Sequence, residues 1–390
     1  MLLIRLYPFV YCDFKENKVL FFDTLNKRIE CFQFYENVYM ENKLSFVVND
    51  NSINREVASK IDEDHWGKVD KIVSDKTKLL KNSSTELYNY YNVFFSKKTD
   101  NKYISKALIK KLNINLTNKI SLFFYVINET KNESMSSKVF TLVYNSLSYF
   151  ENLEIIELNA DSISLNKNSD ILRKLKNKCC SLIVNIPLLD FKSHKKEILS
   201  ICEDATINVL IDNLSDISLT DILILKSCPP NVFFKIQIKN TTEYSLLETL
   251  NLKGDQQLKV TVNPNCCVND LNELLSYDVT DIIGMPITID NLIHKEFINS
   301  LYWGDLFVDI NGDILCNDNQ VIGNFINIDD VQYHRLIGQD SLWKMTRNKY
   351  SYCCKCLFRN ICPPLSRVEF YNKRIFCNMI FDKSYYDMIK

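Results

Sequence analysis

The sequence predicts an α/β protein: a partial (βα)6 TIM-like barrel with an N-terminal α+β region and a small cysteine-rich C-terminal metal-binding module. Three observations predict this fold class. Apolar, β-branched runs alternate with helically spaced segments at intervals of roughly thirty residues, a hairpin-like pattern precedes them, and four closely spaced cysteines follow them. We therefore expect three domains, at residues 1–113, 114–298 and 299–390.

The N-terminal region begins with a predicted hairpin. Two strand-like runs, Arg5–Asp13 and Lys18–Asp23, flank the turn-prone Lys15-Glu16-Asn17. Further along we expect a strand at Lys27–Phe34 and two mostly helical stretches at Asn54–Leu80 and Thr85–Phe95. A polar loop is expected at Ser96–Lys102.

The central segment carries the strand–helix rhythm. The predicted strands are Ile120–Ile127, Leu153–Leu158, Ser181–Ile186, Thr206–Ile211, Val232–Ile238 and Leu258–Val262. The segments with helical spacing are Val139–Phe150, Ile171–Lys178, Lys195–Cys202, Leu219–Ser227, Tyr244–Leu250 and Val268–Tyr277. Continuous apolar strands are expected in a parallel sheet that is covered on both faces. Six units fit a partial barrel at least as well as an open doubly wound sheet, and periodicity alone does not decide between them.

After residue 298 the rhythm stops. Asn311-Gly312 lies between two short strand-like runs and predicts a hairpin with a type I′ turn. A short helix is expected at Ser341–Asn348, just before the cysteine-rich stretch. This part of the chain is predicted to be a small separate module built around a metal rather than around a large core.

Composition excludes several classes of function. The chain is 46% hydrophobic and has a net charge of -1, which gives no electrostatic reason to expect nucleic acid or an anionic membrane as a partner. It has only 7 glycines and no GxGxxG or P-loop pattern, which argues against a nucleotide-binding protein. The N-terminus lacks signal-peptide features and no apolar run is long enough to span a membrane, so we expect a cytoplasmic protein. Its 14 cysteines are then not expected to form disulfides.

Four of these cysteines have the spacing of a metal site. Cys353, Cys356, Cys362 and Cys377 form the pattern C-x2-C-x5-C-x14-C, with Pro363 directly after the third. A following proline is typical of iron–sulfur loops, whereas structural zinc sites usually use two close pairs of ligands. An iron–sulfur cluster is therefore favoured and zinc is the alternative. Cys354 could substitute for Cys353, and four buried apolar cysteines without a metal are the remaining interpretation.

Three aspartates are weaker candidates. Asp161, Asp190 and Asp212 fall near the ends of predicted strands, where barrel enzymes place functional groups. Aspartate is also common there as a helix N-cap.

The cysteine-rich stretch resembles a SPASM domain, the C-terminal extension of radical SAM enzymes that modify ribosomal peptides. That family's pattern is C-x9-15-G-x4-C, a gap, C-x2-C-x5-C-x3-C, another gap and a final C, and it binds two auxiliary [4Fe–4S] clusters. Cys353, Cys356 and Cys362 match the central spacing and Cys377 matches the final cysteine. The resemblance implies that these four hold one cluster.

The other auxiliary cluster of the family is expected to be absent. Cys316 follows Gly312 with three intervening residues rather than four, and no cysteine lies nine to fifteen residues before Gly312. Ser366 stands where the family has its next cysteine.

The strand–helix array resembles the partial barrel of radical SAM enzymes, which bind their SAM-cleaving cluster through C-x3-C-x2-C after the first strand. No such motif occurs in this chain, and the loop after Ile120–Ile127 reads NETKNESMSS. The glycine-rich motif expected after the second strand is replaced by LNADSIS. The resemblance therefore implies that SAM is not bound and that the barrel has no radical SAM activity.

As a whole, residues 114–390 resemble pseudo-radical SAM proteins of bacterial peptide-maturation systems. The resemblance implies a non-catalytic role in which the chain binds a precursor peptide or a partner radical SAM maturase. The N-terminal region would then recognise a leader peptide by strand addition, or serve only as a cap on the barrel. The alternative is an enzyme with a non-radical or redox active site at the barrel mouth.

Overall fold

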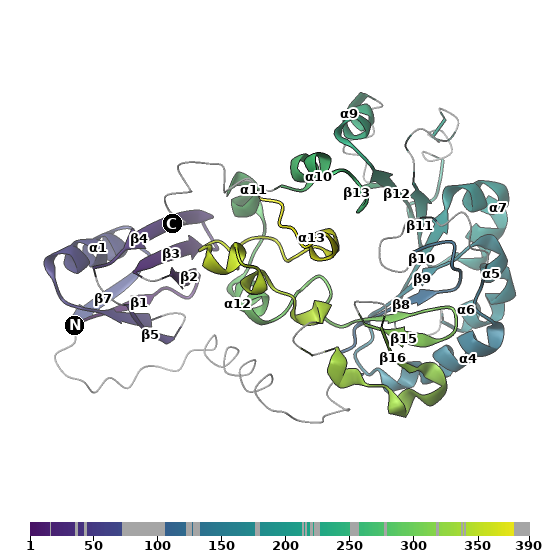
Figure 1. The fold of residues 1–390 in the computed structure, drawn as a ribbon, viewed down its shortest axis with the longest axis horizontal. Coiled ribbons are helices and arrows are strands. Elements are labelled where there is room, and N and C mark those ends of the chain that lie inside the picture. The colour runs from purple at the N-terminus through teal and green to yellow at the C-terminus, as the bar shows by residue number, and fades with distance from the viewer. Residues whose placement is uncertain are drawn as a thin grey trace. The chain divides into compact units, whose positions relative to one another are not determined.

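In the computed structural model the chain forms two compact units (Figure 1). The first unit comprises Met1–Thr99, Tyr277–Leu301 and Lys344–Lys390. The second unit comprises Asp100–Ser276 and Tyr302–Trp343. Compact units and domains need not coincide, so the three-domain assignment stays a prediction.

The structure describes residues 1–71 and 106–377 apart from a set of short gaps. These gaps are residues 16, 36–37, 43–44, 122–126, 128–132, 176–179, 213, 215–216, 219–220, 222–226, 250–256, 277–278, 317–319, 337 and 339–340. The predicted helix Thr85–Phe95, the predicted loop Ser96–Lys102 and most of the predicted helix Leu219–Ser227 lie outside the described residues. In the part that is described, no helix has the length and apolar character needed to cross a membrane.

The second unit is built on a large, mostly parallel sheet, so the α/β class is confirmed. The strand order is β13-β12-β11-β10-β9-β8-β14-β15-β16, and the pairs from β13 to β14 are parallel. Its strands are β8 Lys111–Asn115, β9 Ile155–Asn159, β10 Ser181–Pro187, β11 Thr206–Ile211, β12 Val232–Ile238, β13 Leu258–Val262, β14 Asp305–Val308, β15 Asp313–Leu315 and β16 Val321–Asn324.

Helices between these strands cover one face of the sheet (Figure 1). They are α4 Ser137–Asn145, α5 Ser162–Lys167, α6 Ser169–Leu175, α7 Leu188–Ile201, α9 Thr241–Thr249 and α10 Val268–Leu275, with a 3-10 turn at Ser146–Tyr149. The face that packs on α4–α7 is apolar and carries residues such as Ile114, Leu158 and Ile186. Burial of this face is the main hydrophobic contribution to the stability of the unit.

The prediction for the first strand of the array is wrong. That strand is β8, at Lys111–Asn115. Residues 122–126 of the predicted strand lie outside the described residues, and its two ends, Ile120 and Ile127, form an isolated antiparallel bridge with each other. The run KLNIN lacks a continuous apolar pattern because Asn113 and Asn115 alternate with its apolar residues and face the polar side of the sheet. The other five predicted strands are confirmed as β9–β13 within a few residues.

The hairpin predicted near Asn311-Gly312 is confirmed as β14–β15, but its turn is not of type I′. A type I′ turn needs positive φ at both central residues, and only Gly312 has it, with φ 81°. The loop closes through the Gly312 N–H, which donates to the Asp309 carbonyl at 3.1 Å. The predicted helix Ser341–Asn348 is instead two short 3-10 turns, Leu342–Lys344 and Arg347–Lys349.

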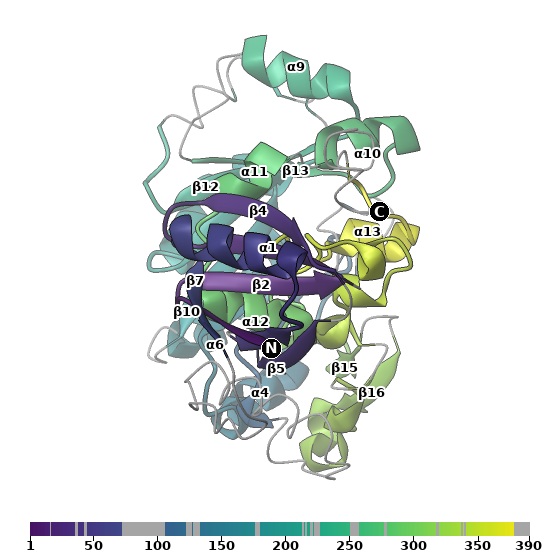
Figure 2. The ribbon, with the colours of Figure 1, turned by 90° about the vertical axis from the view of Figure 1, so that its left-hand side faces the viewer.

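The first unit contains two antiparallel sheets and a helix that packs against their strands (Figure 2). One sheet has the order β5-β6-β1-β7, and the other has the order β2-β3-β4. The elements are β1 Leu2–Leu6, β2 Val10–Lys15, β3 Lys18–Asp23, β4 Arg28–Gln33, β5 Tyr39–Asn42, β6 Ser45–Val48, α1 Ser52–Glu63 and β7 Gly67–Lys71.

The predicted N-terminal hairpin is confirmed as β2–β3, and the next predicted strand is confirmed as β4. The run Arg5–Asp13 is not one strand, however. It spans β1 and β2, which are separated by a turn in which the Val10 N–H donates to the Tyr7 carbonyl. The helix predicted over Asn54–Leu80 is too long, because α1 ends at Glu63 and β7 follows.

Strands β2 and β3 are largely buried on both faces, which explains their continuous apolar runs. Alternate residues such as Val10 and Phe21 pack into a core with β1 and α1. The intervening residues Tyr11, Leu20 and Phe22 pack on the other face.

The second face of this sheet packs against the cysteine-rich loops. One core is shared by this face and the loops, and it contains Tyr11, Leu20 and Phe22 together with Leu357, Phe358, Ile361 and Cys362. The segment that carries α11 Val279–Gly284 and α12 Ile289–Phe297 adds residues to the same core. The cysteine-rich stretch therefore does not stand as a separate module without a core. It is a layer of the first unit.

Candidate functional site

The loops that carry the predicted metal ligands are closed by backbone hydrogen bonds. Cys353 begins a 3-10 turn, Cys353–Lys355, and its carbonyl accepts from the Cys356 N–H at 2.9 Å. The Cys362 N–H donates to the Phe358 carbonyl at 2.8 Å. The helix α13, Arg367–Asn372, then reverses the chain and returns Cys377 to the same core.

The structure brings the four predicted cysteines together. Burial raises the pKa of the Cys362 thiol, and the negative charges of Cys353, Cys356 and Cys377 raise it further. The pKa of Cys356 is raised to about 11 by burial and by Cys353 and Cys377. Burial and the charge of Cys377 also raise the pKa of Cys353. The thiols are therefore close enough to sense one another's charge in every pairing.

Cys354 does not share this position. Its side chain is exposed and its Sγ lies 3.3 Å from the Ser351 carbonyl oxygen. It therefore does not replace Cys353 in the group of four.

The chemistry of the four thiols suits a metal, although their side chains are not arranged in a coordination geometry. Among the described residues, no group of three or more His, Cys, Asp or Glu side chains is arranged closely enough to hold a metal ion. Four cysteine thiols are nonetheless the donor set both of [4Fe–4S] sites and of structural zinc sites with four cysteine ligands. Burial favours the neutral thiol here, so binding a metal would displace protons from these groups.

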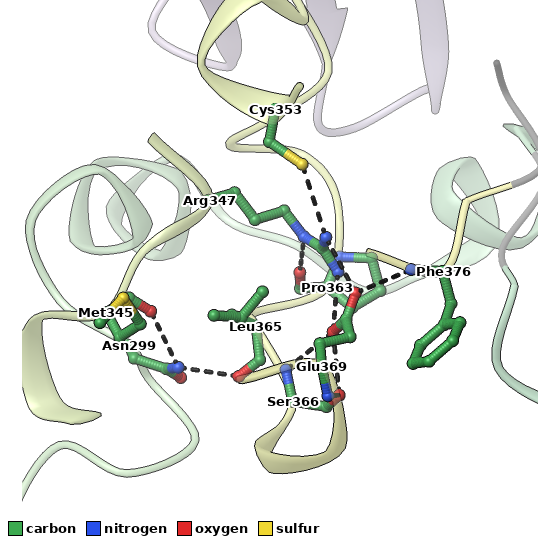
Figure 3. Close-up of polar contacts among 9 residues, drawn as sticks. All are labelled: Asn299, Met345, Arg347, Cys353, Pro363, Leu365, Ser366, Glu369 and Phe376. Carbon is green, nitrogen blue, oxygen red and sulfur yellow. Dashed lines mark hydrogen bonds and ion pairs between the residues drawn. The ribbon is translucent and has the colours of Figure 1, made fainter. Parts of the chain in front are cut away.

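A buried ion pair holds three of the cysteine-bearing segments in place (Figure 3). The Arg347 guanidinium donates to both carboxylate oxygens of Glu369 at 3.2 and 3.4 Å. It also donates to the Pro363 carbonyl at 2.6 Å and approaches the Cys353 Sγ at 3.9 Å. Arg347 therefore connects the loop of Cys353 to the residue that follows Cys362.

Glu369 extends the same connection to the fourth cysteine. Its Oε1 accepts from the N–H of Phe376, the residue before Cys377, at 3.4 Å. Its other oxygen accepts from the N–H and hydroxyl of Ser366, which forms the capping box of α13. Ser366, where the resembled family has a cysteine, thus serves here as a helix N-cap. The S-x-x-E pattern of a capping box is the sequence signal that could have found Glu369.

Strand β2 forms hydrogen bonds with the loop between Cys356 and Cys362. Asp13 accepts from the Arg359 guanidinium at 2.7 Å and from the Asn360 side-chain amide at 3.1 Å. The same Asn360 amide donates to the Tyr11 hydroxyl at 2.9 Å. No sequence motif indicates this contact, because its partners are more than 340 residues apart.

Helix α12 contacts the loop of the third cysteine, Cys362, through Lys295. The Lys295 ammonium donates to the carbonyls of Ile361 and Cys362 at 3.2 and 3.0 Å. Burial lowers the pKa of Lys295 to about 8, although the negative charge of Cys362 opposes that change.

A second polar cluster lies on the sheet of the second unit. Asn115, Asn159, Asn185 and Asn208 occupy the same register on β8–β11. Their amides form a one-way chain: Asn208 donates to Asn185 at 2.9 Å, Asn185 to Asn159 at 2.8 Å and Asn159 to Asn115 at 2.7 Å. The Asn208 Oδ1 at the start of the chain has no partner among the described residues.

A charged group adjoins this asparagine ladder. Glu157 pairs with Lys111, lies 3.6 Å from the Lys235 ammonium and accepts from Asn185 at 2.8 Å. Burial alone would raise the pKa of Glu157, but the charges of Lys111 and Lys235 hold it at about 2. Burial lowers the pKa of Lys235, and Glu157 only partly opposes this. Sequence reasoning misses this face because it places the first strand wrongly.

The aspartates singled out from the sequence serve mainly as helix caps and ion-pair partners. Asp161 caps α5 through a capping box with Ser164. The Lys119 ammonium lies 3.1 Å from Asp161 and 3.7 Å from Asp190. Asp212 directly follows the end of β11.

Comparison with known proteins gives distant structural likenesses only. No family model matches the chain, and no curated protein matches it. A crystal structure of Streptococcus suis SuiB bound to the precursor peptide SuiA matches with a TM-score of 0.38 and 12% identity, covering 98% of both chains. SuiB bound to S-adenosylmethionine matches with a TM-score of 0.37 and 13% identity, covering 99% of this chain and 98% of the other.

A crystal structure of BtrN in complex with AdoMet and 2-DOIA matches with a TM-score of 0.35 and 9% identity, covering 60% of this chain and 88% of that one. These scores and identities are too low to indicate a function, which has to be inferred from the chain's own residues.

Proposed function

We propose that this chain is a catalytically degenerate relative of radical SAM/SPASM enzymes that acts in the maturation of ribosomally synthesised peptides. It binds a precursor peptide or a partner radical SAM maturase and carries one auxiliary-type [4Fe–4S] cluster. The observation that supports the proposal is the proximity of Cys353, Cys356, Cys362 and Cys377 in the first unit, where the charges of the four thiols interact in every pairing. Zinc is the alternative metal.

The role of the cluster is mainly structural. When bound, it would tie together the loops that Arg347, Glu369 and Asp13 already hold. Iron–sulfur clusters also transfer electrons, so a relay to a partner enzyme is the second role that such a group supplies.

The residues of the second unit do not fit the SAM-cleaving cluster of the resembled family. We infer that β8–β13 are the six strands of the partial barrel. The loop after β8, residues 116–136, contains no cysteine. The turn after β9 is closed by the capping box of Asp161, which is held by Lys119. The loop after β8 and the turn after β9 therefore supply no thiolate for an open iron site that could chelate SAM.

Peptide binding is assigned to the first unit. A sheet edge with unpaired backbone groups can accept an extended peptide as an added strand. Strand β2 is occupied by its contacts with Arg359 and Asn360. In the described part of the chain β4 pairs only with β3, so its outer edge is the edge that a leader peptide would extend.

Hydrogen–deuterium exchange tests this assignment. The peptides are those encoded by short reading frames beside the gene for this chain. A peptide that binds should slow exchange of the amides of Arg28–Gln33 and leave those of β13 unchanged. Tight binding without protection of β4 would remove the strand-addition part of the proposal. No binding by any such peptide would leave the partner maturase as the target, to be tested by co-purification of the two proteins.

The second candidate function is enzymatic and is favoured by the polar sheet face. Glu157, Lys235 and the asparagine ladder place charged and hydrogen-bonding groups on one face of the strands, as in an active site. Mass spectrometry of the bound peptide separates the two candidates. The leading proposal predicts an unchanged peptide mass. A mass change that is lost in Glu157→Gln while peptide binding persists would establish the enzyme.

A further inference from the structure

We propose that Lys295 is the counter-ion of the metal–thiolate centre, and that its positive charge sets the redox potential of the centre and strengthens metal retention. The inference rests on the metal-binding part of the proposed function. Lys295 is a positioning residue in this role, because it acts on the centre through charge and through the ligand loop rather than as a ligand itself.

The position of the ammonium is the first observation. Lys295 lies in the last turn of α12, and its Nζ donates to the carbonyls of Ile361 and Cys362. Both carbonyls belong to the loop that carries the third thiol. Lys295 therefore fixes the loop of Cys362, and its positive charge interacts electrostatically with the Cys362 thiol.

The second observation is the lack of an acidic partner for this charge. The neighbouring cations are neutralised, since Arg347 pairs with Glu369 and Arg359 pairs with Asp13. Within the described residues no carboxylate pairs with Lys295, whose ammonium donates to two neutral carbonyls. A buried ammonium without a counter-charge is costly, and a negatively charged centre held by Cys362 and its neighbours would balance this one.

The third observation is what surrounds the charge. Lys295, Arg347, Arg359 and Cys362 line a small, partly open hollow in the first unit. Its remaining walls are apolar or neutral, including Ile298, Asn299 and Leu365. Three cationic side chains therefore lie near Cys362, and only the two arginines among them are paired with carboxylates.

The charge of the centre itself completes the inference. Four thiolates around either a [4Fe–4S]2+ core or a Zn2+ ion leave two net negative charges. Burying them is unfavourable unless a nearby cation compensates. Reduction of an iron–sulfur centre adds one more negative charge, so a fixed cation stabilises the reduced state more than the oxidised state and raises the potential.

The test separates the charge of Lys295 from its hydrogen bonds. Lys295→Gln keeps a donor for the carbonyls but removes the charge, Lys295→Met removes both, and Lys295→Arg keeps both. Lys27→Met is the matched control, because Lys27 also donates to a backbone carbonyl of the first unit, that of Met285 at 3.1 Å. Each protein is reconstituted anaerobically with iron and sulfide, and its midpoint potential is measured by a dye-mediated titration followed by electron paramagnetic resonance.

We expect Lys295→Gln and Lys295→Met to shift the one-electron equilibrium by about tenfold or more towards the oxidised form, a potential about 59 mV lower. Lys295→Arg and Lys27→Met should keep the wild-type potential. The inference is overturned if Lys295→Gln behaves as the wild type, whether or not Lys295→Met differs, because the effect would then come from hydrogen bonds alone.

The same set of variants serves if the metal is zinc, which has no redox change. The measurement is then competition with a chelator, in which both neutral variants should lose zinc at about tenfold lower chelator concentration. Equal retention in all variants overturns the inference. A wild-type protein that binds neither metal defeats the proposed function itself, which distinguishes the two failures.

Discussion

The guanidinium of Arg347 and the carboxylate of Glu369 form a two-point ion pair that is almost fully buried, with side-chain exposures of 5% and 3%. The pair touches three of the four cysteine-bearing segments through Cys353, Pro363 and Phe376. The pair thus connects the ligand loops through contacts between protein groups, and we expect it to organise them independently of a metal.

Breaking this pair should destabilise the metal-free protein. Arg347→Gln leaves the Glu369 carboxylate buried without its partner, and we expect a loss of about 3–5 kcal/mol in the free energy of unfolding. Urea denaturation of the metal-free protein measures it. The control is Arg55→Gln, which removes an exposed ion pair with Asp50 and should cost less than about 1 kcal/mol. Equal effects of the two substitutions would contradict the organising role of Arg347.

Strand β2 should affect metal retention although it carries no ligand. Asp13→Asn keeps the shape of the side chain but removes the charge that holds Arg359 and the loop before Cys362. We expect a destabilisation of about 1–3 kcal/mol and faster loss of iron to a chelator. Asp70→Asn, on an exposed pair with Arg5 in the same unit, is the control. If iron is lost equally fast from both variants, β2 has no special role in holding the loop.

The polar sheet face predicts a pH dependence of stability. Glu157 has its pKa lowered from 4.5 to about 2 in the folded chain. Its contribution is therefore fully present above pH 4.5 and is lost as the pH falls towards 2, and it amounts to about 3 kcal/mol. Glu157→Gln should remove this part of the acid dependence between these two pH values. Unfolding free energies of both proteins at pH 7 and pH 3 test it, and parallel losses in the two proteins would contradict it.

The asparagine ladder should be most sensitive at its centre. Asn185 exchanges hydrogen bonds with Glu157, Asn159 and Asn208, so Asn185→Leu leaves several buried polar groups without partners. Asn208→Leu removes the end of the chain, whose Oδ1 is already unpaired among the described residues. We expect the first substitution to cost about 1–3 kcal/mol more than the second. Thermal unfolding of the two variants side by side decides, and an equal or reversed order would show that the chain does not act as a unit.

The sequence predicts the parallel strands because their apolar runs are continuous, and it predicts the four cysteines because their spacing is local. It fails at β8, where Asn113 and Asn115 interrupt the apolar pattern. It could not show that Asp13 holds the loop of Arg359, since contacts between distant segments leave no local signal. For the same reason the sequence does not reveal the shared core of Tyr11 and Phe358, and it predicts a cysteine-rich stretch that stands alone.

The most direct test of the proposed function is the content of iron and acid-labile sulfide per chain after anaerobic reconstitution, with Cys356→Ala as the control. We predict about four of each, lost in the variant, as for a single [4Fe–4S] cluster. Zinc in place of iron would keep the four ligands but exclude electron transfer. A value near eight of each, by contrast, would mean that a second cluster binds elsewhere. That result would contradict the central claim that the chain has lost the SAM-cleaving centre.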